Sequence, residues 1–156
     1  MDKELTIKYR EYASVSELAQ ADRELIEAAV EAADGAYAPY SGFHVGAAVR
    51  LDEGPIVRGS NQENVAYPSG LCAERTALFA ASAQNPQSAG FEALAIVGRN
   101  QKGELCAASP CGACRQAMSE YEQRQKHPLR VLCLLDGGGV REVASAADLL
   151  PLAFEM

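Results

Sequence analysis

The sequence has no long uninterrupted apolar run. Every apolar stretch is broken by a charged or turn-forming residue well before the roughly 18 residues that a membrane-spanning helix needs. The first residues, Met1–Glu4, also lack the pattern of a signal peptide. We therefore expect a soluble, cytoplasmic protein without a membrane anchor.

Basic residues are scarce. The 14 Lys and Arg are outnumbered by 21 Asp and Glu, which gives a formal net charge of -7 at pH 7. Affinity for nucleic acids comes mostly from neutralisation of phosphates by Lys and Arg. The charge balance therefore disfavours DNA or RNA as a partner or substrate.

The chain lacks the signs of a disulfide framework, of disorder and of a second domain. Its 5 cysteines are an odd number in a chain without an export signal, which favours metal binding or catalysis over disulfides. A content of 48% hydrophobic and 22% charged residues is typical of globular proteins. Because 156 residues without repeats or linkers suit one compact unit, we expect a single domain over residues 1–156.

The apolar periodicity predicts an α/β fold. Helices are expected over residues 21–36, 72–83 and 110–121, with a short one over 146–150. Strands are expected over residues 43–51, 56–60, 91–98, 129–135 and 140–143, the first two joined by a turn at 52–55. This order predicts a mixed central sheet of about five strands with helices packed on it.

Two cysteines mark the start of the helix expected after Pro110. Cys111 and Cys114 are three residues apart, so both thiols can face one ion, and the positive helix end favours thiolates. The pair alone is equally typical of a structural zinc knuckle. A closed structural site would need a second Cys-x-x-Cys or a His pair, but His44 and His127 are isolated.

Cys72 supplies a third thiol at the start of another helix. Three protein ligands with an open fourth position are the arrangement of a catalytic zinc, whose bound water has a pKa of about 7. Glu74, on the first turn of that helix, is suited to shuttle protons, although Glu also favours helix starts through the helix dipole. Arg75 is expected to offset the net charge of -1 of three thiolates and Zn²⁺, unless it is an ordinary surface arginine.

The remaining cysteines are expected to be passive. Cys133 lies within an apolar strand and is predicted to be a small buried hydrophobe, and Cys106 is interpreted as an unreactive thiol.

These motifs resemble those of the zinc-dependent cytidine deaminases, which carry Cys-Ala-Glu followed downstream by Pro-Cys-x-x-Cys. The resemblance covers roughly residues 20–156 and includes further segments at 38–41, 43–48, 61–67, 72–79, 110–116 and 149–154. A cysteine at position 72, where nucleotide and nucleic-acid deaminases usually have His, is similar to the small homotetrameric type. Residues 1–19 form an N-terminal extension, in which alternating Leu5, Ile7 and Tyr9 predict an extra edge strand.

The resemblance implies a three-layer α/β fold, one Zn²⁺ per subunit, and a homotetramer with pockets shared between subunits. It also implies substrate-binding roles: Phe43 packs on the pyrimidine, Asn61 and Glu63 bind the ribose hydroxyls, the Ala73 backbone recognises the base edge, and Phe154 closes the pocket of a neighbouring subunit. From the residues alone, Phe43 could equally be strand core, and Asn61 and Glu63 could be ordinary polar loop residues.

The implied reaction is hydrolytic deamination of cytidine and 2′-deoxycytidine in pyrimidine salvage, with zinc-bound hydroxide as nucleophile and Glu74 as proton shuttle. An antibiotic nucleoside, as in the blasticidin S deaminases, is an alternative substrate. A non-catalytic zinc-stabilised module is a second alternative, and polynucleotide editing is disfavoured by the acidity of the chain. No function is assigned to the charged segment at residues 120–128.

Overall fold

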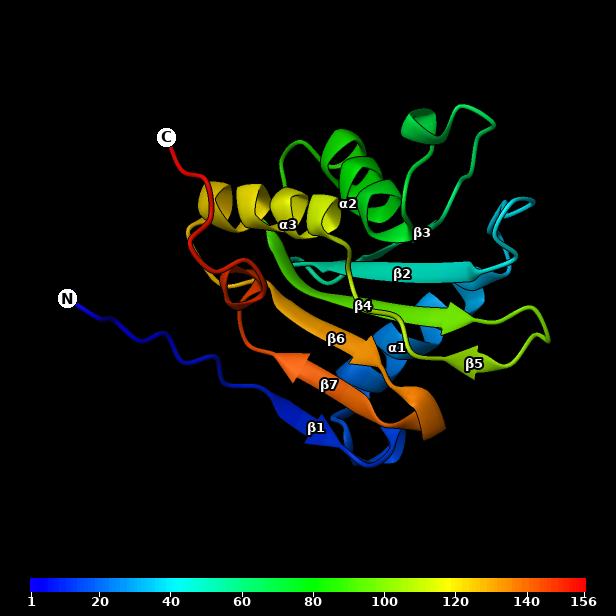
Figure 1. The fold of residues 1–156 in the computed structure, drawn as a ribbon, viewed down its shortest axis with the longest axis horizontal. Coiled ribbons are helices and arrows are strands. Elements are labelled where there is room, and N and C mark those ends of the chain that lie inside the picture. Colours follow the sequence, from blue (N-terminus) through cyan, green and yellow to red (C-terminus); the bar gives the residue numbers. More distant parts are fainter.

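A computed structural model describes residues 1–156 as one sheet with helices on both faces (Figure 1). The three α-helices are α1 (Gln20–Ala33), α2 (Ala73–Gln84) and α3 (Gly112–Gln125). The strands are β1 (Arg10–Tyr12), β2 (His44–Leu51), β3 (Ile56–Ser60), β4 (Phe91–Arg99), β5 (Leu105–Cys106), β6 (Arg130–Leu134) and β7 (Val140–Val143). Short 3₁₀ helices include η4 (Ala146–Leu149), which precedes the C-terminal segment. None of the helices is long and apolar enough to span a membrane.

The sheet is mixed, as the order of elements predicts. Its strands lie in the order β1-β7-β6-β4-β2-β3, and β5 pairs with β4. The pair β4 and β6 is parallel, because the chain between them passes through α3, and the other pairs are antiparallel. The sheet has seven strands. About five and an extra N-terminal edge strand were expected, and the strand that was not expected is β5.

The central strand β4 is buried on both of its faces. Leu94 and Ile96 belong to a hydrophobic cluster with residues of α2 and α3. Ala93, Ala95 and Val97, which alternate with them, belong to a second cluster with residues of α1. The predicted three layers are therefore confirmed: α1 covers one face of the sheet, and α2 and α3 cover the other (Figure 1).

Two glycines allow helices to lie directly on the strands. Gly46 in β2 faces α1, where a Cβ atom would collide with the backbone of Ala29 and Ala33. Gly59 in β3 faces α2, where a Cβ atom would lie 2.8 Å from the carbonyl oxygen of Ala73 and closer still to the Ala77 nitrogen. Gly59 thus fixes how closely the first turn of α2, which follows Cys72, approaches the sheet.

The predicted N-terminal edge strand is present, but it lies at Arg10–Tyr12 and not at the alternating residues Leu5, Ile7 and Tyr9. Leu5, Ile7 and Tyr9 are 63%, 41% and 59% exposed and lie before β1 in an irregular segment. The strand forms instead where its side chains find partners on β7, since Arg141 binds Glu11 and Tyr12 binds Glu142. Alternation alone could not locate it, because neither face of this segment is buried.

Candidate active site

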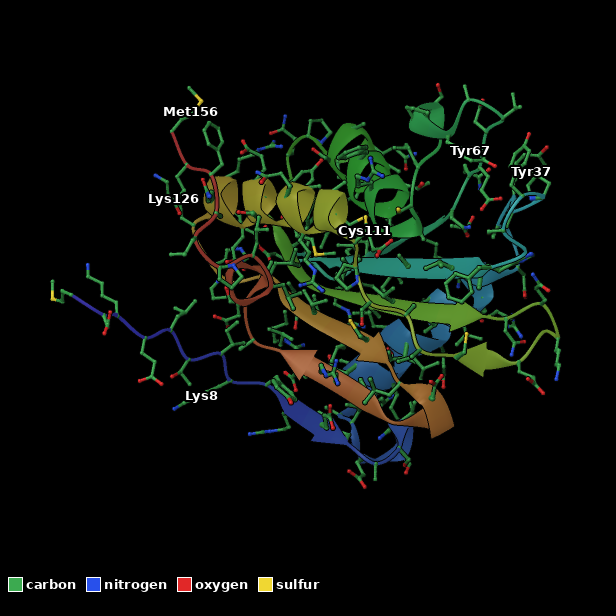
Figure 2. The ribbon with its side chains drawn as sticks, in the orientation of Figure 1. Lys8, Tyr37, Tyr67, Cys111, Lys126 and Met156 are labelled. Carbon is green, nitrogen blue, oxygen red and sulfur yellow. The ribbon has the colours of Figure 1, made fainter.

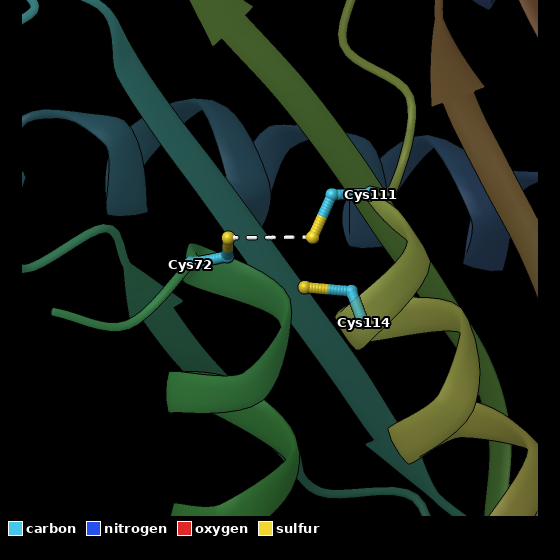
Figure 3. Close-up of side chains that lie close together, drawn as sticks. All are labelled: Cys72, Cys111 and Cys114. Atoms are coloured by element: carbon cyan, nitrogen blue, oxygen red, sulfur yellow. Dashed lines mark hydrogen bonds between the residues drawn. The ribbon is translucent and has the colours of Figure 1, made fainter. Parts of the chain in front are cut away.

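The starts of α2 and α3 bring three thiols together. Cys72 is the residue that caps α2, Cys111 caps α3, and Cys114 lies in the first turn of α3. Figure 3 shows their sulfur atoms pointing toward one another from the two helices. The Sγ atoms of Cys72 and Cys111 are 3.7 Å apart, and all three lie within 4.8 Å of one another. The predicted ligand set therefore converges on one point.

The spacing of these sulfurs suits zinc. Tetrahedral zinc with Zn–S bonds of about 2.3 Å places its sulfur ligands about 3.8 Å apart. The separation of 3.7 Å between Cys72 and Cys111 matches this value. Three thiols from two helices leave a fourth coordination position for a water molecule or substrate.

A neighbouring thiol and a guanidinium favour the thiolate form of Cys72. Sulfur contact with the thiol of Cys114, together with a hydrogen bond from Arg75, lowers the pKa of Cys72 to about 5. Arg75 Nη2 lies 3.6 Å from Cys72 Sγ, and its Nε is buried without a hydrogen-bond partner. The guanidinium thus faces the sulfur of Cys72, at a distance from which it can offset negative charge there.

Glu74 is buried beside the thiols. Its side chain is on the first turn of α2 and the residue is only 4% exposed. Burial, reinforced by the negative charge of Cys72, raises the pKa of Glu74 to about 7. A carboxyl group with such a pKa can both take up and release a proton near neutral pH.

A pocket of about 430 Å³ adjoins the thiols. Cys72, the one thiol of the three that lines it, shares its wall with Arg75, Asn61 and Glu63. The other lining residues are Tyr40, Ser41, Gln62, Asn64, Tyr67, Gly70 and Leu71. The expected ribose-binding residues therefore share one cavity with a metal ligand.

Asn61 is held by the start of β2. Its Nδ2 donates a hydrogen bond to the carbonyl oxygen of Phe43 (2.9 Å), and its Oδ1 accepts one from the Val45 backbone nitrogen (2.8 Å). The residue is 9% exposed. One amide hydrogen of Asn61 remains free for another acceptor.

Glu63 is held by the loop before β2. Its Oε1 accepts hydrogen bonds from the backbone nitrogens of Tyr40 (2.9 Å) and Ser41 (3.1 Å), and its Oε2 accepts one from Ser41 Oγ (2.6 Å). The hydrogen bond from Ser41 Oγ is the main cause that lowers the pKa of Glu63, so the group is a carboxylate at neutral pH. No role was predicted for Ser41, because its contact with Glu63 joins residues 22 positions apart and leaves no local sequence pattern.

The other predicted substrate residues do not line this pocket. Ala73 is fully buried, and the Phe43 ring is 37% exposed beside Gly98, at which a Cβ would lie 2.9 Å from Phe43 Cζ. Phe154 is 74% exposed on the C-terminal segment. Of the thiols expected to be passive, Cys133 is buried, and burial raises its pKa to about 12.

A mixed sheet that presents three thiols and a buried carboxylate at two helix starts defines an α/β zinc enzyme with an open coordination position. The chain belongs to the family described as the cytidine and deoxycytidylate deaminase zinc-binding region, whose model matches residues 19–127.

Known proteins are similar over most of the chain. A cytidine deaminase from Halalkalibacterium halodurans is 39% identical over 138 residues, which cover 83% of this chain and 91% of that relative. The crystal structure of a cytidine deaminase from Burkholderia pseudomallei is similar with a TM-score of 0.73 and 46% identity, over 84% of this chain and 97% of that chain. A blasticidin-S deaminase from Bacillus cereus is less similar, at 31% identity over 67% of this chain and 75% of that relative.

Proposed function

We propose that this protein hydrolyses the amino group of cytidine and 2′-deoxycytidine and releases uridine or 2′-deoxyuridine and ammonia, as a pyrimidine salvage enzyme. The observation that carries the proposal is the buried carboxyl of Glu74 next to three converging thiols. The similarity to cytidine deaminases over four fifths of the chain supports the choice of substrate.

Cys72, Cys111 and Cys114 hold the zinc ion. Zinc held there would lower the pKa of a coordinated water and would in this way provide a hydroxide nucleophile near neutral pH. Glu74 would accept a proton from this water and deliver it to N3 of the base. It would then take the proton of the hydroxyl group added at C4 and pass it to the departing amine. Its pKa of about 7 suits both directions of transfer. Arg75 stabilises the thiolates through its contact with Cys72.

The remaining site residues bind the nucleoside. Asn61 and Glu63 bind the ribose hydroxyls from the wall of the pocket, an assignment supported by the backbone hydrogen bonds that fix both side chains. Phe43 packs on the pyrimidine, and its backbone oxygen is bound to Asn61. The backbone of Ala73, next to Cys72, recognises the base edge.

We propose that the enzyme is a homotetramer in which Phe154 closes the pocket of a neighbouring subunit. An aromatic side chain that is 74% exposed near the chain end is suited to such a contact. Tyr67, 74% exposed at the rim of the pocket, lies near a subunit contact in the same arrangement.

An antibiotic aminopyrimidine nucleoside is the second candidate substrate. The specific observation in its favour is the similarity to a blasticidin-S deaminase, which is weaker than the similarity to cytidine deaminases. A non-catalytic zinc module leaves the burial of the Glu74 carboxyl unexplained, because an ionisable group without a function is seldom buried beside thiolates.

The proposal is tested by ammonia release from cytidine, 2′-deoxycytidine and blasticidin S, with the Glu74→Gln variant assayed in parallel. We expect rapid release from the first two nucleosides. The variant should keep one zinc per chain, because Glu74 is not a ligand. It should lose at least about 100-fold in rate, since a positioned proton shuttle contributes this much or more.

Zinc content is measured on both proteins by atomic emission, so that loss of metal and loss of proton transfer are distinguished. A Glu74→Gln variant with near-normal rate would contradict the role of the carboxyl. A zinc-replete wild-type protein that is active only on blasticidin S would establish the second substrate instead, and one inactive on all three would favour the non-catalytic module.

A further inference from the structure

Helix α3 binds both ends of η4, the short 3₁₀ helix at Ala146–Leu149. At its start, Glu122 accepts hydrogen bonds from the backbone nitrogens of Ala146 (2.8 Å) and Ala147 (3.1 Å) and from Ser145 Oγ (2.6 Å). The backbone N–H groups at the start of a helix have no partner within the helix. Glu122 therefore fixes where η4 begins.

At the other end of η4, Arg115 binds a carbonyl. Its Nη1 donates a hydrogen bond to the backbone oxygen of Leu149 (3.0 Å). Arg115 and Glu122 are seven residues apart on α3, so their side chains lie two turns apart along one face of that helix. The carboxylate of Glu122 thus binds the start of η4, and the guanidinium of Arg115 binds its end.

Arg115 also binds the loop that carries a zinc ligand. Its Nε donates a hydrogen bond to the carbonyl oxygen of Pro110 (2.8 Å), the residue before Cys111. Arg115 itself follows Cys114 directly, and its backbone nitrogen donates to the carbonyl oxygen of Cys111 (3.0 Å). One guanidinium therefore joins the metal loop to a segment 34 positions further along the chain.

We propose that Arg115 is a positioning residue that couples the zinc loop to the C-terminal segment. By binding Pro110 it holds Cys111 in the place from which its sulfur meets Cys72, and by binding Leu149 it fixes the direction in which residues 150–156 leave the fold. The planar guanidinium suits this task, because it presents several donors in a fixed geometry and so can serve two carbonyls at once. A lysine at this position reaches one carbonyl at a time.

The test measures the rate at which zinc passes from the folded protein to a coloured chelator in the absence of substrate. This rate is compared between the wild type and variants of Arg115. We expect Arg115→Gln to release zinc about tenfold faster or more, since groups that orient metal ligands typically contribute 10- to 100-fold to metal affinity. The rate of zinc release from Arg115→Lys should lie between those of Arg115→Gln and the wild type. If the glutamine variant does not fold, the lysine variant provides the test.

A second readout follows η4 directly. Hydrogen exchange of the amides of residues 146–150 should be faster in Arg115→Gln, because the end of η4 is released, and also faster in Glu122→Gln. Zinc release from Glu122→Gln should stay close to wild type, since Glu122 does not contact Pro110. This variant thereby separates the coupling from a general weakening of the C-terminal segment.

Arg124→Gln is the matched control. Arg124 is exposed on the same helix, and its Cζ lies 5.2 Å from the centroid of the Tyr121 ring. Neither readout should change in this variant. The proposal is overturned if both Arg115 variants release zinc within twofold of wild type, or if zinc release accelerates while exchange of η4 stays unchanged. Because no substrate is used, the result does not depend on the proposed reaction.

Discussion

His127 follows Lys126, which ends α3 at the opposite end of that helix from Cys111 (Figure 2), and it joins two connections there. Its Nε2 lies 2.7 Å from Asp52 Oδ2, in the turn that follows β2. Gln125, two residues earlier, binds both backbone groups of Phe91, with distances of 2.8 and 2.9 Å. The end of α3 is thereby tied to the hairpin turn and to the start of β4.

This contact predicts a pH-dependent stability. Burial alone lowers the pKa of His127, but the Pro128 carbonyl and the carboxylates of Asp52 and Glu122 outweigh it, so that the pKa is raised in the folded state. The stabilisation is therefore complete below the unfolded pKa of about 6.5 and is lost as the pH rises through the folded value.

The measurement is urea unfolding of the wild type and Asp52→Asn at pH 5.5 and pH 9. We expect the wild type to be the more stable at pH 5.5, by at most about 1 kcal/mol because the pair is partly exposed to water. The difference should shrink at pH 9. An equal difference at both pH values would show that Asp52 acts without the imidazolium.

At the scale of residues, the sequence was informative where chemistry depends on residue type. The spacing of Cys111 and Cys114, together with the place of Cys72 at another helix start, predicted that three thiols converge. The place of Glu74 on the first turn after Cys72 predicted that its carboxyl lies beside them. The sequence could not reveal the contacts of Arg115, because the partners of that side chain are backbone carbonyls, which every residue possesses. The roles of the substrate-binding residues stay predictions.

At the scale of elements, the close contact of α2 with β3 predicts the effect of one added methyl group. A Cβ at position 59 would collide with the backbone of α2 at Ala73 and Ala77. We expect Gly59→Ala to destabilise the protein by about 1–3 kcal/mol or more, since overpacking displaces neighbouring backbone. Because α2 carries Cys72 at its start, the displacement should also accelerate zinc release.

Gly46→Ala provides the comparison, because its added Cβ collides with α1 on the opposite face of the sheet. Both variants should melt at lower temperature, as followed by circular dichroism, but only Gly59→Ala should release zinc much faster. Equal rates of zinc release from the two variants would mean that the metal site responds to overall stability and not to the position of α2 on the sheet.

Element prediction succeeded where burial is strong. The continuous apolar residues of β4 reflect burial against helices on both faces, and this run predicted the strand to within one residue. The two-residue strand β5 was missed, because Leu105–Cys106 is too short to show a period. The helix expected from Pro110 begins at Gly112, since Cys111 adopts an extended backbone as its cap.

At the scale of the whole molecule, the proposed homotetramer predicts complementation between subunits. If Phe154 completes a neighbour's pocket, Phe154→Ala should be impaired although its own Glu74 is intact. Glu74→Gln should be inactive although its own Phe154 is intact. Mixed assemblies of the two should then contain complete pockets and recover part of the activity toward cytidine.

The mixture is prepared by co-expression with two different affinity tags, and its mass is measured by light scattering. Leu152→Ala is the control, because Leu152 is 98% exposed on the same segment and has no assigned contact. A fully active Phe154→Ala variant, or an active enzyme that elutes as a monomer, would contradict the shared pocket.

The pairing of β1 with β7 has a consequence for the order of assembly during synthesis. Tyr12 leaves the ribosome first, but its partner Glu142 follows 130 residues later. Every other strand of the sheet is available before this edge can close, so loop-closure entropy makes β1 a late addition to a sheet that has formed without it. Late pairing of β1 also delays the core beside it, because Leu18 belongs to the hydrophobic cluster on the α1 face of the sheet and Tyr12 and Val15 pack against that cluster.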